Sequence, residues 1–321
     1  MAAMRPRQWT KNVVVLAALV LSLQLLDGER LARAVAAVLI FCAVSSAVYL
    51  TNDLLDIESD RRHPEKRHRP LAAGELAPRW AVVAALALVV ASLVASGLLV
   101  ATPGTVRSSP MLLVAVVGYL LLQLAYSFRL KHMVIVEALS IAGGFVLRVL
   151  AGGAAIDTAI SPWLYLSMIF VALFQAFGKR YDELRVLADA AAGHRRSLEH
   201  YTAPLLEQFI TLSATATIVT YAMYAITTPW RPEGISANAM LLTVPFVIYA
   251  ILRYLYLVQV RGMGGAPEVV LLRDRLMLLA VLGWGLMLLL ILYLWPLLTE
   301  LPILPVPPLP GSGLPGPSFF V

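Results

Sequence analysis

Three regularly spaced aspartates follow the second long apolar run of the chain. Asp53, Asp56 and Asp60 lie at positions i, i+3 and i+7, so they share one face of a helix continuing out of that run. Carboxylates this close repel one another unless a cation lies among them. Mg²⁺ takes one or two carboxylates and completes its shell with water and substrate phosphates. The spacing therefore predicts a magnesium site for a phosphorylated substrate. The expected metal ligands are Asn52, Asp53, Asp56 and Asp60.

Basic residues follow these acids directly. Pro64 and Pro70 end the helix and place Lys66 and Arg69 in a loop suited to holding a phosphate. The alternative interpretation is a solvated helix end whose acids are balanced by the arginines that follow. We favour the phosphate site because acids near a helix C-terminus oppose the helix macrodipole.

A second pair of ionisable residues, Glu137 and Arg148, lies inside an apolar run. Ionisable side chains at membrane depth are costly, and they usually mark a functional site. The two residues are eleven positions apart, so they lie on one helix face. A structural ion pair between them is the alternative interpretation.

The composition shows which elements must position these residues. Apolar residues make up 60% of the 321 residues and charged residues only 14%, which excludes a soluble globular protein and a disordered chain. We therefore predict an all-α polytopic membrane protein with about nine spans. The predicted spans are 12–27, 31–51, 80–101, 111–128, 134–153, 162–178, 204–227, 239–258 and 275–297. The runs lack the alternation of a membrane β-barrel.

The distribution of charge predicts the orientation. Most of the 25 Lys and Arg residues fall in the N-terminal segment and the even-numbered connections, so we expect these on the cytoplasmic side of the plasma (inner) membrane. The net charge of +6 then reflects topology and anionic headgroups, and no nucleic acid partner is expected. We expect one membrane domain over 1–300 and an extracytoplasmic Pro/Gly-rich tail over 301–321. The single cysteine, Cys42, excludes an internal disulfide.

The acidic motif and the His63-Pro64-x-Lys66-x-x-Arg69-Pro70 run together resemble the first signature of the UbiA superfamily of intramembrane prenyltransferases. The fourth connection and the span after it agree, through these residues: Tyr126, Ser127, Lys131, Glu137, Gly144, Arg148 and Gly152. The resemblance implies a UbiA-like helical bundle with a polar cavity that faces the cytoplasm.

The sixth connection departs from the usual pattern of that family. Typical members carry a second Asp-rich motif there, whereas this chain has the run Gly178-Lys179-Arg180-Tyr181-Asp182-Glu183 and, further on, Arg196. A site with more cations than carboxylates is suited to direct bonds with phosphates. This run, the N-terminal Arg5-Pro6-Arg7-Gln8-Trp9-Thr10-Lys11-Asn12 and the later Arg253-Tyr254, Gly264-Gly265 and Asp274-Arg275 resemble the phosphoribose-transferring branch of the superfamily.

The resemblance to this branch implies a Mg²⁺-dependent membrane glycosyltransferase. Its donor is phosphoribosyl diphosphate, its acceptor is a polyprenyl (decaprenyl) phosphate, and its product supplies lipid-linked arabinose for cell-wall arabinan. The expected catalytic residues are Asp53, Asp56, Asp60, Lys179 and Glu183. The expected substrate-binding residues are Lys11, Asn52, Lys66, Arg69, Tyr126, Lys131, Arg148, Arg180, Tyr181, Asp182 and Arg196.

Two other functions are compatible with parts of the pattern. A UbiA-type prenyltransferase would move a prenyl group from its diphosphate to an aromatic acceptor, and the carboxylate-poor sixth connection argues against it. A transporter would be expected to show internal repeats with broken helices, which we do not find. The chain length and saturation of the lipid stay open, as does assembly into a homo-oligomer.

Overall fold

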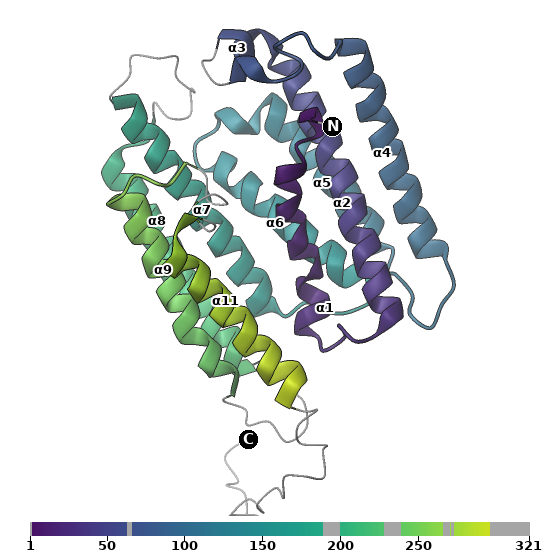
Figure 1. Cartoon of the computed structure of the whole chain (residues 1–321), viewed down its shortest axis with the longest axis vertical. Helices are drawn as coiled ribbons and strands as arrows, with labels where there is room; N and C mark the ends of the chain where they lie inside the picture. Colours follow the sequence, from purple (N-terminus) through teal and green to yellow (C-terminus); the bar gives the residue numbers. More distant parts are fainter. Residues whose placement is uncertain are drawn as a thin grey trace, which may run out of the picture.

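The computed structural model describes residues 2–62, 66–188, 200–227, 239–265, 270 and 273–295, with the side chains of 186–188 left out. All regular structure in these residues is helical, and eight helical segments are long and apolar enough to cross a membrane (Figure 1). They are α2 (Gly28–Leu55), α4 (Pro78–Ala101), α5 (Met111–Phe128), α6 (Val136–Ala155), α7 (Pro162–Ala188), α8 (Ala203–Thr227), α9 (Val244–Gln259) with η6 (Ala239–Thr243) before it, and α11 (Arg275–Leu289) with η7 (Leu290–Leu294) after it. The predicted all-α membrane bundle is confirmed. The predicted tail, 301–321, lies outside the described residues.

The segment predicted as the first span, 12–27, differs from the other eight. The helical structure there begins earlier and ends earlier than predicted, as an eleven-residue 3₁₀ helix, η2 (Pro6–Leu16), and a five-residue α-helix, α1 (Ala17–Leu21). A 3₁₀ helix rises about 2.0 Å per residue and an α-helix about 1.5 Å, so the two together extend about 30 Å. That is about the thickness of the bilayer core. The polar residues Arg7, Gln8 and Lys11 take up the first part of η2, however, so the apolar residues 12–21 extend only about 18 Å, and the segment is not among the eight described helical segments that are long and apolar enough to cross a membrane.

One side-chain row of η2 packs against the bundle. With three residues per turn, side chains three apart lie above one another, and the row Asn12, Val15 and Ala18 is buried. This row packs on α6, where a Cβ built on Gly152 would come within 1.9 Å of the carbonyl oxygen of Val15. Only a glycine permits so close an approach.

Helix α6 is the centre of the bundle. Its first half contributes Ala138 and Ala142 to a core shared with α7, α8 and α9. Its second half contributes Ala151, Ala154 and Ala155 to a core shared with η2, α1, α2 and α5. Small residues let helix backbones approach closely inside a membrane, and this composition lets α6 join both cores.

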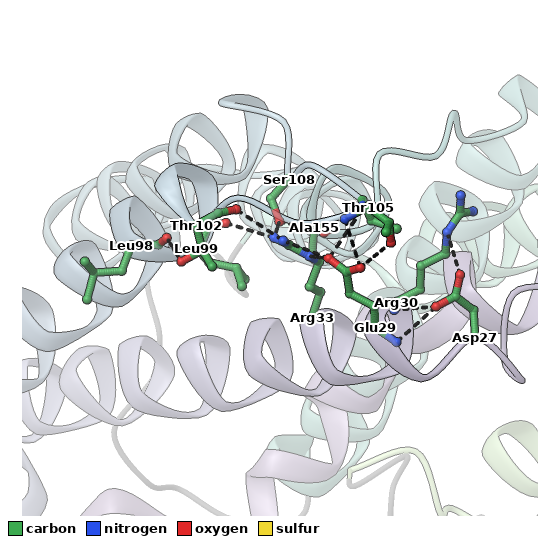
Figure 2. A network of polar contacts seen from close by, with 11 residues as sticks. Asp27, Glu29, Arg30, Arg33, Leu98, Leu99, Thr102, Thr105, Ser108 and Ala155 are labelled. Carbon is green, nitrogen blue, oxygen red and sulfur yellow. Dashed lines mark hydrogen bonds and ion pairs between the residues drawn. The ribbon is translucent and has the colours of Figure 1, made fainter.

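A polar network fixes the end of α2 that lies far from the aspartates (Figure 2). Arg33 is buried, pairs with Glu29, and donates to the carbonyl oxygens of Leu99 (3.1 Å) and Thr102 (3.2 Å). It also donates to Ser108 Oγ over 3.1 Å. Other groups complete the network: Asp27 caps α2, Thr105 donates to Glu29, and Ser108 donates to Ala155. The network ties the connection between α4 and α5 to α2 and α6, so the position of α2 is set before it reaches the acidic motif.

Candidate active site

The helix that carries the acidic motif is interrupted within the motif. Helix α2 ends at Leu55, and α3 (Ile57–Arg62) begins after Asp56, whose φ of −102° and ψ of 9° are not helical. The expectation of one continuous helix with three aspartates on one face is therefore wrong at Asp56. The three aspartates therefore have different ion-pair partners. Asp53 and Asp60 both contact Arg69, whereas Asp56 contacts Lys131.

Arg69 is the partner that Asp53 and Asp60 share. Its Nη1 lies 3.2 Å from Asp53 Oδ1 and 2.6 Å from Asp60 Oδ2. Both aspartates are only 2% exposed, so their charges need nearby cations. Arg5 from the N-terminal segment supplies a second cation to Asp53. The loop expected to hold a phosphate thus places Arg69 beside the acids, whereas Lys66 is exposed in η3 (Lys66–His68).

Asp56 and Asn52 face the connection between α5 and α6. Lys131 Nζ lies 3.1 Å from Asp56 Oδ1, and Ser127 donates to Asn52 Oδ1. The two motifs identified in the sequence, about 75 positions apart, thus meet at the end of α2. Lys131 belongs to the short helix η4 (Leu130–His132).

The exit from η4 is strained and held by a buried tyrosine. Ile135 has φ of 66°, which β-branched residues rarely adopt. Its N–H donates over 2.7 Å to the hydroxyl of Tyr201, which is 4% exposed. Strain of this kind persists only where the surroundings impose it, so Tyr201 fixes the loop that carries Lys131.

Arg180 lies at the buried contact between α6 and α7. It is 2% exposed and pairs with Glu137 (3.1 Å) and with Glu183. The phenol of Tyr126 also interacts electrostatically with Arg180. The alternative interpretation, an ion pair between Glu137 and Arg148, is wrong, because Glu137 pairs with Arg180. Arg180 therefore orients Glu183 and holds α6 against α7.

Arg148 is buried among neutral acceptors in the middle of the bundle. Its guanidinium donates to Asn12 Oδ1 (2.8 Å), to the carbonyl oxygen of Gly144 (2.9 Å) and to the hydroxyl of Tyr119 (2.8 Å). It also lies 4.6 Å from the centre of the Tyr119 ring, a cation–π contact. These contacts fix η2, and with it the neighbouring Lys11, against α5 and α6.

Tyr181 and Asp182, both expected to bind substrate, contact other parts of the protein. Tyr181 donates to Glu207 on α8 over 2.9 Å. Asp182 accepts the backbone N–H groups of Gly264 and Gly265 in the loop after α9. A Cβ on Gly264 would lie 2.5 Å from the carbonyl oxygen of Gly178, so this loop packs directly on α7. Both side chains thus hold α7 to its neighbours.

A further ion pair fixes the start of α11. Arg253 on α9 forms a bidentate contact with Asp274, through distances of 3.1 and 2.7 Å. Asp274 also caps α11 by accepting the N–H of Met277 over 2.8 Å. The hydrogen bond from Arg253 is the main reason that the pKa of Asp274 lies below its ordinary value.

A mainly apolar cavity of about 700 Å³ lies between η2–α1 and helices α7, α8, α9 and α11. Lys11 and Gln175 are among the few polar residues in its lining. In its wall, Tyr221 accepts from Trp284 over 2.6 Å and is 2.7 Å from Thr243 Oγ1. The cavity follows η2 and α1, which begin beside the acidic motif and run away from it (Figure 1). It is suited to an apolar chain with a charged head near Lys11.

The expected metal ligands of the acidic motif fit a Mg²⁺ ion that is bound partly by the protein and partly by substrate phosphates. Within the described ranges, no group of three or more His, Cys, Asp or Glu residues is close enough to hold a metal ion, so the three aspartates do not form one ligand set. The carboxylates of Asp53 and Asp56 and the amide of Asn52 are hard oxygen donors at one helix end. Such a set fits an ion that takes one or two protein ligands and shares its shell with substrate phosphates.

Several residues that organise this site were not among the expected site residues. They are Arg5, Asn12, Tyr119, Ser127 and Tyr201. Arg5 lies in the N-terminal run that contributes to the family resemblance and to the predicted topology, but nothing in that run indicated that Arg5 pairs with Asp53. Of the expected residues, Lys179 is half-buried on α7, and Arg196 lies outside the described residues.

Comparisons with known proteins agree with this architecture. Residues 13–267 match the model of the UbiA prenyltransferase family. The chain is 41% identical over 291 residues to a decaprenyl-phosphate phosphoribosyltransferase of Mycobacterium tuberculosis, covering 88% of this chain and 90% of that protein. It is 39% identical to the enzyme of the same name from Corynebacterium glutamicum, covering 92% and 87%.

The solved structures show the same fold at lower sequence identity. A UbiA homolog from Archaeoglobus fulgidus, bound to GPP and Mg²⁺, superposes with a TM-score of 0.65 and 17% identity, covering 90% of this chain and 95% of that one. Both the sequence match and the helical bundle lead to one assignment. The chain belongs to the UbiA prenyltransferase family.

Proposed function

We propose that this protein transfers the 5-phosphoribosyl group of phosphoribosyl diphosphate to decaprenyl phosphate, or a similar polyprenyl phosphate, and releases diphosphate. The observation that carries the proposal is the 41% identity, over 88% of the chain, to a relative named for this reaction. The product would supply lipid-linked arabinose for cell-wall arabinan.

The donor's diphosphate is assigned to the end of α2. Asp53, Asp56 and Asn52 would hold Mg²⁺ together with the diphosphate, and the ion would neutralise charge on this leaving group. Lys131 and Arg69 already lie against these acids, so both can donate to phosphate oxygens from the protein side.

The reaction needs positioning more than a strong base. The bond from ribose C1 to the diphosphate oxygen breaks, and a bond from C1 to an oxygen of the lipid phosphate forms. The lipid phosphate is already anionic, so no proton must be removed before it attacks. Ribose C1 becomes oxocarbenium-like, as in glycoside hydrolysis. Glu183, which Arg180 holds in place, is a candidate for binding a ribose hydroxyl.

The acceptor lipid is assigned to the apolar cavity. Lys11 lies in its lining and can pair with the lipid phosphate. The tail would follow η2 and α1 along the cavity and continue into the bilayer. In this arrangement, the phosphate lies at the end of the cavity nearest the acidic motif, which is where the donor binds.

We further propose that this site faces the cytoplasm and that the C-terminus is extracytoplasmic. The basic residues around the site support this orientation by the positive-inside rule. Phosphoribosyl diphosphate is a cytosolic metabolite, so the donor would reach the site directly.

The test is a transfer assay with membranes that contain the full-length protein, labelled phosphoribosyl diphosphate and decaprenyl phosphate. We expect Mg²⁺-dependent formation of labelled lipid, and Asp53→Asn should abolish it. Glu58→Gln is the matched control, because Glu58 is an exposed acid of α3 that pairs only with Arg61 among its ion-pair partners in the described residues. If no labelled lipid forms, but a prenyl group moves from prenyl diphosphate to an aromatic acceptor, the proposal is wrong.

A further inference from the structure

Arg5 is held in an unusual conformation between two short helices. It lies between η1 (Ala2–Met4) and η2, with φ of 51° and ψ of 63°, in the left-handed region that few residues other than glycine adopt. Ser46 on α2 fixes the segment on both sides of Arg5. Its hydroxyl accepts from Trp9 Nε1 over 3.0 Å, and it lies 3.2 Å from the carbonyl oxygen of Met4 and 2.7 Å from that of Cys42, which share its single proton. The backbone is thus anchored, and the Arg5 side chain is directed along α2.

The guanidinium of Arg5 lies on the carboxylate that is central to the site. It pairs with Asp53 and lies 5.0 Å from the centre of the Tyr49 ring, one turn earlier on α2. The Asp53 side chain is 2% exposed, whereas that of Arg5 is 28% exposed. The carboxylate is therefore fixed inside the protein, while the cation lies at its boundary and can leave toward solvent.

The charges of the acidic motif balance without a metal ion. Asp53, Asp56 and Asp60 are paired with three cations, and these are Arg5, Arg69 and Lys131. A divalent cation that entered alone would leave two uncompensated positive charges in a partly buried site, which is unfavourable. The same ion bound to a diphosphate brings the compensating negative charge with it.

Of these three cations, Arg5 can leave its aspartate most readily. Arg69 bridges two aspartates, and Lys131 belongs to a loop fixed by Tyr201. Among the ion pairs of the described residues, Arg5 contacts only one carboxylate. Its side chain is 28% exposed, as much as that of Arg69 (27%) and more than that of Lys131 (17%). Its displacement breaks this ion pair and the contact with the Tyr49 ring, and leaves Asp53 still paired with Arg69.

We propose that the Arg5 guanidinium pairs with the Asp53 carboxylate while no divalent cation is bound. When the cation arrives with the donor's diphosphate, Arg5 leaves Asp53 to the cation and binds the diphosphate instead. This inference rests on the proposed function for the position of the diphosphate. It adds that the metal and the donor enter together, and it assigns Arg5 as the residue that couples them.

The test measures metal binding directly. Full-length protein in detergent is titrated with Mn²⁺, whose free form is quantified by electron paramagnetic resonance, with and without inorganic diphosphate. The wild type should bind Mn²⁺ weakly alone and much more tightly with diphosphate. In Arg5→Ala, affinity for Mn²⁺ alone should rise on the order of tenfold, the value of one hydrogen bond to a charged group. At saturating Mn²⁺, affinity for diphosphate should fall by a similar factor.

Arg7→Ala is the matched control, because Arg7 is an exposed arginine of the same segment. It should change neither affinity. Arg5→Lys retains the charge, so it should raise Mn²⁺ affinity less than Arg5→Ala does, and it replaces Arg5→Ala if that variant does not fold. Unchanged or weaker binding of Mn²⁺ alone in the Arg5 variants would overturn the proposal. Because the probes are Mn²⁺ and inorganic diphosphate, this result is independent of which diphosphate the transfer assay identifies as the donor.

Discussion

Arg148 donates to Asn12 over 2.8 Å, and this hydrogen bond joins the centre of α6 to the N-terminal 3₁₀ helix. The two residues are 136 positions apart in the chain. Lys11, which we assign to the lipid phosphate, is the neighbour of Asn12. A residue deep in the bundle therefore sets the position of a residue in the substrate cavity.

Replacing Arg148 with lysine should destabilise the protein by about 2 kcal/mol. A lysine keeps the charge but lacks the planar fork of donors that reaches Asn12, Gly144 and Tyr119 together. Thermal unfolding in detergent measures the loss. We also expect a higher KM for the lipid, because Lys11 is no longer held. Arg107→Lys, at an exposed position, is the control, and an equal loss of stability there would contradict the explanation.

Gly152→Ala should cost roughly 1–3 kcal/mol of stability by overpacking. The new Cβ would lie 1.9 Å from the carbonyl oxygen of Val15, so η2 must move away from α6. Gly97→Ala is a matched control on α4, since a Cβ there meets nothing within 4 Å. Alanine favours a helix over glycine, so Gly97→Ala should be neutral or slightly stabilising. Equal melting temperatures for the two variants would show that the contact is unimportant.

The network at the far end of α2 predicts a stability effect with little effect on the reaction. Arg33→Met should destabilise by about 2 kcal/mol, because it removes the donor from the carbonyl oxygens of Leu99 and Thr102 and from the buried Ser108 Oγ. Arg30→Met should have little effect, since Arg30 forms a partly exposed pair with Asp27 (Figure 2). Below the melting temperature, transfer activity of both variants should equal that of the wild type. A loss of activity in folded Arg33→Met would mean that this network also affects the site.

The pair of Asp274 and Arg253 predicts a pH dependence of stability. The pKa of Asp274 is lowered in the folded protein, so its contribution is present above the ordinary aspartate pKa, near 3.9. It is lost as the pH falls through the lower, folded value. Asp274→Asn should therefore be less stable than the wild type at pH 7, and the difference should shrink in acid. Melting temperatures of the two proteins between pH 7 and pH 3 measure this, and a constant difference would refute it.

The sequence indicated many of the residues that lie at the candidate site, but it did not indicate which of them form ion pairs with one another. The aspartates, Lys131 and Arg69 were identified from local motifs, because each motif lies within a few turns of the chain. The pairing of Glu137 with Arg148 failed for a geometric reason. Eleven residues of α-helix span about 16 Å, so two side chains on the same face at that spacing do not touch.

The partners contributed by other helices could not be read from local patterns. Arg180 reaches Glu137 across the contact of α6 and α7, and Arg5 reaches Asp53 from a different segment. The 3₁₀ geometry of η2 and its close approach to Gly152 were also missed. Periodicity predicted an apolar span there, but not three residues per turn.

The three-residue repeat of η2 constrains how the N-terminal segment can change in length. Inserting one residue between Arg5 and Asn12 would turn the faces by about 120° relative to each other. An insertion before Lys11 would, relative to Arg5, move Lys11 onto the buried row of Asn12 and Asn12 onto the exposed row of Val13, even though no side chain had been replaced. An insertion of three residues would return each side chain to its original row but shift Arg5 by about 6 Å along the axis of η2. The segment is thus expected to tolerate substitutions at the exposed Arg7, but no change in its number of residues.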